Sequence, residues 1–393
     1  MTGIVESRRV RGELLVETVF QLPKDSHTDL DRFGREIARF EKGETSAAEF
    51  RVFRVPRGVY EQRESDTFML RVRCPAGIVL PRQMRALAGV SKRYGNGVLH
   101  VTTRQDIQIH RVLLKDIHPA LVELHAAGLS TKGGGGNTVR NIAGCFDAGV
   151  CANEAFDATP YVIAVTEFLL VDPLSFQLPR KYKIAFSGCP KDCAGATIND
   201  LGFVARRRGD ARGFSVYVGG GMGAASRVGD LLEDFVPADE AHLVTEAVKR
   251  VFDQHGNRRN RHRARIRFLV EELGLERFRE LYQAELTALR EAGVAKLAVG
   301  DLQHSASSHT PQEGEAASGF SEWQRRFVVL QKQKDHSLVH IPLFLGDIDA
   351  ERLMDIHLRS RSRIAVVARA AGAGHSFHDE RVSRTLDGDN CEQ

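Results

Sequence analysis

The sequence predicts an α+β protein that begins with a ferredoxin-like half-domain, in which helices cover one side of an antiparallel sheet. From Phe68 onward apolar and polar residues alternate, which is typical of a strand with one buried face. Pro81 then opens a helix, and Gly95-Asn96-Gly97 ends it before two further strands and a second helix. This order of strand, helix, strand, strand and helix is that of a ferredoxin-like half. We expect the later elements at residues 98–103, 107–114 and 117–127.

A short amphipathic helix precedes this half-domain. Its apolar residues recur with the spacing of one helix face: Leu30, Phe33, Ile37 and Phe40. The next apolar stretch begins only at Phe50. We therefore expect a helical arm in residues 1–50 and the half-domain in residues 51–130.

A second region, expected at residues 131–300, begins with a run of four glycines, carries four clustered cysteines and ends in helices. One helix is predicted at 241–254, where apolar residues share one side, and another from about Arg261 to Gly274.

The remaining residues predict a linker and a partial repeat. The stretch at 301–320 is rich in Ser, Gly, Glu and Thr, as linkers are. Beyond it, Leu345–Leu353 echoes Ala76–Met84. We therefore expect residues 321–393 to form an incomplete second ferredoxin-like half.

Composition places the chain among folded proteins and excludes a disordered one, since 42% of its 393 residues are hydrophobic and 27% are charged. Met1–Gln21 contains no apolar segment of signal-peptide type, and no stretch approaches the length of a membrane span. We expect a cytoplasmic protein without membrane contact. The net charge is only +4, yet arginines gather at 206–208 and 258–265, which indicates an anionic partner.

Four of the six cysteines form two close pairs. Cys145 and Cys151 are separated by five residues, and Cys189 and Cys193 by three. Disulfides are not expected in a reducing cytosol, and four soft thiolates suit a [4Fe–4S] cluster or a zinc ion. Zinc sites prefer two residues between paired cysteines, which favours the cluster. The alternative is that all four are small buried residues.

Basic residues recur on strands that should be buried. Arg71 and Arg73 lie on one face of the strand predicted from Phe68, and Arg140 follows the glycine run. Lys181 and Lys183 alternate along another predicted strand. Cations on a buried sheet face need an anion to pair with. The alternative is that each is a solvated surface charge.

A polar face follows on the neighbouring strand, opposite Ile107 and Ile109. Hydrogen-bonding side chains of this kind can hold carboxylates. They are Thr102, Arg104, Asp106, Gln108 and His110.

Several motifs resemble the sirohaem-dependent nitrite and sulfite reductase family, and the resemblance covers about residues 50–290. The motifs are Arg54–Arg63, Phe68–Arg73, Val101–Gln105, Leu178–Lys183 and the two cysteine pairs. The resemblance implies that residues 131–300 form an α/β sirohaem and [4Fe–4S] domain. It also implies that Cys145, Cys151, Cys189 and Cys193 hold the cluster, and that Cys193 ligates the sirohaem iron as well.

The same resemblance implies roles for the polar residues. The oxyanion substrate, sulfite or nitrite, would be met by four cations: Arg71, Arg140, Lys181 and Lys183. The cofactor would be contacted by Arg104, Gln108, His110 and Asn141. The implied reaction is a six-electron reduction to sulfide or ammonia, with electrons from ferredoxin or a separate flavoprotein.

Other functions fit part of the pattern. A related oxygenase of cobalamin synthesis would keep the cluster, and an electron carrier would need the cysteines alone. A zinc-stabilised nucleic-acid-binding module would use the arginines at 258–267, but no aromatic residues interleave with them, so we expect no nucleic-acid partner. The incomplete second half indicates either a homodimer that completes the site or a longer protein of which this chain is a part.

Overall fold

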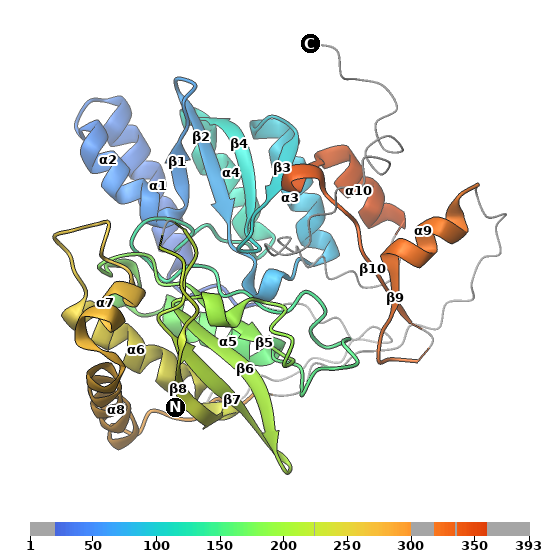
Figure 1. Cartoon of the computed structure of the whole chain (residues 1–393). Coiled ribbons are helices and arrows are strands. Elements are labelled where there is room, and N and C mark those ends of the chain that lie inside the picture. Colours follow the sequence, from blue (N-terminus) through green and yellow to red (C-terminus); the bar gives the residue numbers. More distant parts are fainter. Residues whose placement is uncertain (1–19, 224, 300–317, 335, 360–393) are drawn as a thin grey trace.

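The computed structural model describes residues 20–223, 225–299, 318–334 and 336–359, whose helices and strands are drawn in Figure 1. Their buried side chains form two main hydrophobic cores. The predicted linker at 301–320 lies largely outside the described residues. No helix in the described ranges has the length and apolar character needed to cross a membrane.

The first core lies between helices and a five-stranded antiparallel sheet of order β1-β2-β4-β3-β11. The alternation predicted from Phe68 is confirmed, because Leu70 and Val72 are fully buried in this core. The helix that Pro81 opens ends at Tyr94, where a side chain on Gly95 would meet the carbonyl oxygen of residue 110 at 2.8 Å. The elements are α1 (Ser26–Glu41), α2 (Ala47–Arg54), β1 (Val59–Glu61), β2 (Thr67–Val72), α3 (Pro81–Tyr94), β3 (Val98–Val101), β4 (Ile107–Leu113) and α4 (Leu114–Ala126).

The second core lies beneath a four-stranded sheet of order β5-β6-β7-β8, in which only β5 and β6 are parallel. Its centre is aromatic: the rings of Phe186 and Phe203 stack at 4.3 Å, and Phe214 meets both edge-on. The elements are α5 (Thr159–Leu170), β5 (Ile184–Ser187), β6 (Leu201–Arg208), β7 (Ala211–Val218), β8 (Asp230–Pro237), α6 (Ala241–His255), α7 (Ile266–Leu273) and α8 (Leu275–Glu291).

The helix predicted from about Arg261 begins later, at Ile266. Before it, the side chains of Asn257 and Asn260 accept hydrogen bonds from backbone N–H groups at 259, 260 and 262. Asparagine side chains that bond nearby backbone in this way favour turns over helix. The arginine-rich stretch is therefore a loop.

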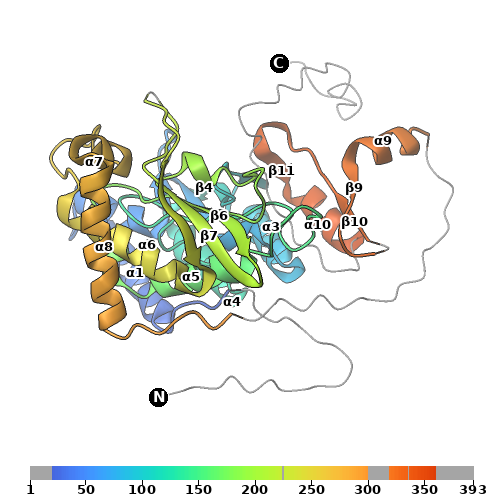
Figure 2. The same cartoon turned by 60° about the horizontal axis from the view of Figure 1, so that its bottom comes forward.

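The C-terminal elements return to the first sheet. β11 pairs antiparallel with β3, and α10 packs on α3. A left-handed residue followed by a glycine precedes both helices, Ala76 before α3 and Leu345 before α10, as the sequence echo suggests. Figure 2 shows these elements on the side of the molecule away from α7 and α8. They are α9 (Phe320–Phe327), β9 (Val328–Leu330), β10 (Ser337–Val339), β11 (Asp347–Asp349) and α10 (Ala350–Arg359).

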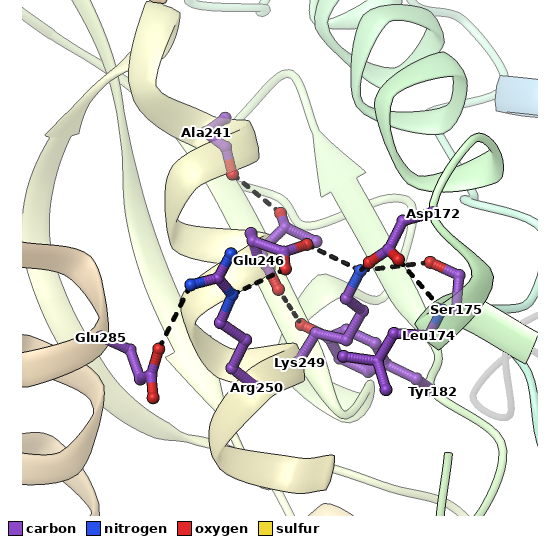
Figure 3. Close-up of polar contacts among 10 residues, drawn as sticks. Asp172, Leu174, Ser175, Tyr182, Ala241, Glu246, Lys249, Arg250 and Glu285 are labelled. Carbon is purple, nitrogen blue, oxygen red and sulfur yellow. Dashed lines mark hydrogen bonds and ion pairs between the residues drawn. The ribbon is translucent and has the colours of Figure 1, made fainter. Parts of the chain in front are cut away.

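A buried lysine fixes α6 to the segment that leads into β5 (Figure 3). Lys249 has no exposed side-chain surface, and its ammonium lies between the carboxylates of Glu246, at 2.7 Å, and Asp172. Its Nζ also donates to Ser175 Oγ at 3.3 Å. Tyr182 donates to a backbone carbonyl of α6 at 3.2 Å. The residues before β5 are thus held against the core.

Lys249→Met should destabilise the fold by about 3 kcal/mol, because Asp172 and the buried Glu246 then lose the ammonium between them. Of the two, only Glu246 keeps an ion pair among the described residues, with Arg250. Urea unfolding of the variant measures this loss. Lys115→Met, which removes an exposed lysine of α4, is the matched control. Equal unfolding midpoints for the two variants would contradict the prediction.

Candidate functional site

The two cysteine pairs meet because the segments before them run side by side. Val139 pairs with Tyr182 and Ala143 with Ala185, both in parallel. Because the two segments are parallel, they end at the same side of the sheet. The loop with Cys145 and Cys151 follows the first segment, and the loop with Cys189 and Cys193 follows the second.

The thiols of the four cysteines lie close enough to influence one another. Sγ of Cys189 lies 3.8 Å from Sγ of Cys193, and the N–H of Gly188 donates to Cys145 Sγ at 3.2 Å. A hydrogen bond with Cys193, together with burial, raises the pKa of Cys145. Burial, with the thiols of Cys193 and Cys151 nearby, raises the pKa of Cys189 to about 11. Ionising these thiols is costly, and a bound metal cluster would offset that cost.

Within the described ranges, no three Cys, His, Asp or Glu side chains are arranged to hold a single metal ion. Cys193 lies beside both Cys189 and Cys145, and Cys151 lies near Cys189, so the four thiols gather in one place, as the ligands of an iron–sulfur cluster do. The donor set therefore fits the cluster.

The loop between Cys189 and Cys193 is built around Asp192, a residue to which sequence analysis gave no role. Its backbone is left-handed, with φ 51°. Its carboxylate accepts hydrogen bonds from Ser187 Oγ at 2.5 Å, from the N–H of Ala196 at 2.6 Å and from Thr197 Oγ1 at 2.7 Å. An aspartate shortly before small residues is the local signal of such a turn.

Two of the predicted anion-binding arginines share one backbone oxygen. Arg71 Nη1 donates to the carbonyl of Gly134 at 3.0 Å, and Arg140 Nη1 donates to the same oxygen at 2.5 Å. A side chain on Gly134 would meet the carbonyl oxygen of Arg71 at 2.7 Å, so only glycine fits between these elements. The glycine run thus sets the distance between the two guanidinium groups.

The two predicted lysines join this group. Burial and the neighbouring cations Arg265 and Arg140 lower the pKa of Lys181. Burial, with Arg104 and Arg265, lowers the pKa of Lys183 to about 7. The nearby carboxylate of Asp200 is already bound by both arms of Arg265, at 2.9 and 2.8 Å.

In the part of the chain that the structure describes, neither lysine ammonium has a carboxylate within ion-pair distance. Partly buried cations without a carboxylate partner are costly unless an anion completes the site.

Arg73 lies just after the strand that carries Arg71, but its side chain bonds backbone carbonyls of the glycine-run segment. Its guanidinium is almost wholly buried and donates to the carbonyls of residues 132, 139 and 140, at 3.1, 2.7 and 3.2 Å. It therefore holds the glycine run in place and does not face the pocket.

The predicted cofactor-binding residues fall into two groups. With its amide turned to accept from Arg71 Nη2 at 2.9 Å, Gln108 donates to His110 Nε2 at 3.1 Å, so these two lie beside the arginine pair. Burial and the adjacent His100 lower the pKa of His110.

Arg104 and Asn141 form the other group, at the junction of the two sheets. Arg104 donates to Ile184 O at 2.7 Å, to Asn199 Oδ1 at 2.6 Å and to the carbonyl of Asn141. The Nε of Arg104 and the Oδ1 of Asn141 are buried without a protein partner. The orphaned N–H of Arg104 could donate to a cofactor carboxylate, whereas the Asn141 oxygen could only accept a hydrogen bond from a donor.

The sequence of this chain is similar to those of known nitrite and sulfite reductases. Residues 135–288 match the nitrite and sulphite reductase 4Fe-4S domain, and residues 60–127 match the nitrite/sulfite reductase ferredoxin-like half domain. An assimilatory ferredoxin-dependent nitrite reductase of Haloferax mediterranei is 36% identical, over 58% of this chain and 42% of its own length. A ferredoxin–nitrite reductase of Synechococcus elongatus is 33% identical, over 74% and 54% respectively.

The fold has a solved counterpart. The Mycobacterium tuberculosis NirA protein superposes with a TM-score of 0.67 and 24% identity, over 87% of this chain and 64% of that one. At this identity the likeness shows the fold alone. The chain spans about half the length of the curated relatives that it matches.

The low pKa of Lys183 predicts a pH dependence of stability in the cofactor-free chain. A folded-state pKa of about 7 lies below the usual lysine value, so the folded chain disfavours the ammonium. Below about pH 7 the folded chain carries the full free-energy cost of the buried ammonium. As the pH rises above about 7, Lys183 loses its proton in the folded chain and this cost disappears. Stability should therefore increase by about 2 kcal/mol between about pH 7 and pH 9. Urea unfolding at both values tests it, and Lys183→Met should lose the increase; a variant that keeps it in full refutes the prediction.

Proposed function

This chain belongs to the nitrite and sulphite reductase family, and we propose on that basis that it carries the catalytic site for six-electron reduction of sulfite to sulfide or of nitrite to ammonia. The observation that carries the proposal is that the paired segments leading to the cysteine loops also carry partly buried lysines without a carboxylate in ion-pair distance among the described residues. A cluster alone explains the thiols, and a bound anion would explain the lysines, while the buried carboxylate of Asp106 offsets part of the arginine charge.

Residues from both sheets and from the loops between them would hold the cofactors. Cys145, Cys151, Cys189 and Cys193 would ligate the [4Fe–4S] cluster, and Cys193 would also ligate the sirohaem iron. Arg104, Asn141, Gln108 and His110 would contact the sirohaem. When bound, the two groups supply the redox chemistry and the iron position for the oxyanion.

The four cations would bind and orient that oxyanion. The guanidinium groups of Arg71 and Arg140 stay charged, and their shared carbonyl fixes their direction. An anion beside Lys183 raises the pKa of its ammonium, so Lys183 would take up a proton near neutral pH as the substrate binds. Lys183 Nζ would then hold a proton that it could donate to an oxygen of the bound oxyanion.

Ferredoxin is the electron donor we propose, since several relatives are named for it. The zinc and nucleic-acid alternative gains no support from the arginine loop. Arg258 donates to the carbonyl of Gln177, Arg263 pairs with Glu271, and Arg265 binds Asp200, so much of that charge is used within the protein.

Lys183→Gln should lower turnover of sulfite or nitrite by about a hundredfold without loss of cluster or haem absorbance, because it removes one charged donor from the pocket. Steady-state rates with reduced viologen and each anion measure this, and the rates also show which anion is the substrate. Lys115→Gln is the matched control on the exposed face of α4. A chain that holds both cofactors and reduces neither anion would contradict the proposed function.

A further inference from the structure

The loop between Cys145 and Cys151 is contacted by residues that follow it by more than 170 positions in the sequence. The backbone N–H of Lys332 donates to Val150 O at 2.9 Å. The side-chain amide of Gln333 donates to Gly149 O at 2.7 Å. Both residues lie in the turn that joins β9 to β10.

An ion pair reinforces these contacts. Lys332 Nζ lies 2.5 Å from Glu154 Oε1, and Glu154 Oε2 accepts the N–H of Gly149 at 2.9 Å. Only 3% of the Glu154 side chain is exposed, and its burial raises its pKa. A buried carboxylate needs a cation nearby, and in the described part of the chain Lys332 supplies it.

The residue that follows β10 contacts the neighbour of the other cysteine of the pair. The ring of His340 meets the ring of Phe146 edge-on, with centroids 5.5 Å apart. Contacts from one hairpin therefore lie next to both Cys145 and Cys151.

The two cysteine loops differ in how they are held. Asp192 fixes the loop between Cys189 and Cys193 from within, through four hydrogen bonds. Among the described contacts, the loop between Cys145 and Cys151 has backbone turns, such as Cys151 N–H to Asp147 O at 2.8 Å, and is tied by side chains mainly to residues that follow it, Glu154 among them.

From this contrast we infer that the β9–β10 hairpin is a brace for the loop between Cys145 and Cys151, and that Lys332 is a positioning residue for the cluster. The inference rests on the proposed function, since the cluster is what the loop would hold. The β9–β10 hairpin thus contributes to the cluster site, although the cysteines of that site all lie before residue 200. A loop held at both ends keeps its thiolates in place and slows release of the cluster.

The test uses the full chain loaded with its cluster. Lys332→Met should speed loss of the visible cluster absorbance to a chelator by about tenfold, because the buried carboxylate of Glu154 then loses the half-exposed ammonium that pairs with it. Lys332→Arg should restore the wild-type rate, because the guanidinium keeps the charge beside Glu154. Lys334→Met is the matched control, since that lysine lies in the same turn and is exposed.

Hydrogen exchange of the amides at 146–154 gives a second readout that needs no cofactor. Faster exchange in Lys332→Met than in Lys334→Met supports the brace, and equal exchange overturns it. Equal rates of cluster loss in the two variants overturn it as well. A wild-type chain that never takes up a cluster would refute the proposed function, and the exchange experiment would still decide whether the hairpin holds the loop.

Discussion

The site depends on the parallel alignment of two short segments, residues 139–143 and 182–185. The N–H of Arg140 donates to Tyr182 O at 2.9 Å, and the N–H of Phe186 donates to Ala143 O at 2.9 Å. These bonds fix the register of the two segments. Both cysteine loops therefore begin at the same end of the paired segments. Arg140 and Lys183 lie on the segments themselves, and Lys181 directly precedes the second. A register change of one residue would turn Lys181 and Lys183 into the core in place of Tyr182. Backbone pairing, more than any single side chain, creates the site.

That arrangement has an energetic cost, which the surrounding structure offsets. Lys183 and Lys181 lie among other cations with lowered pKa values, as expected for groups arranged for an anion and not for stability. Several buried charges elsewhere are satisfied: Arg73 by three carbonyls, Arg265 by Asp200, and Lys249 by two carboxylates. The contrast between these groups and the two lysines marks the candidate site.

Local patterns in the sequence predicted the local elements. The alternation from Phe68 and the boundaries Pro81 and Gly95 located the first sheet and its helix, and the cysteine spacing predicted the metal centre. Pairings between distant residues left no such signal. The strand β11 joins β3 across more than two hundred residues, and the turn at Lys332 reaches the loop before Cys151. Arg71 and Arg73 look equivalent by alternation, yet only the folded chain separates a residue beside the pocket from one that holds backbone carbonyls.

The central claim is that four thiolates of one chain hold a single iron–sulfur centre beside a haem. Iron and acid-labile sulfide content, measured on protein purified without oxygen from cells that make sirohaem, tests it most directly. The claim predicts about four sulfides and about five irons per chain, four in the cluster and one in the haem. Zinc in stoichiometric amount without inorganic sulfide would contradict it.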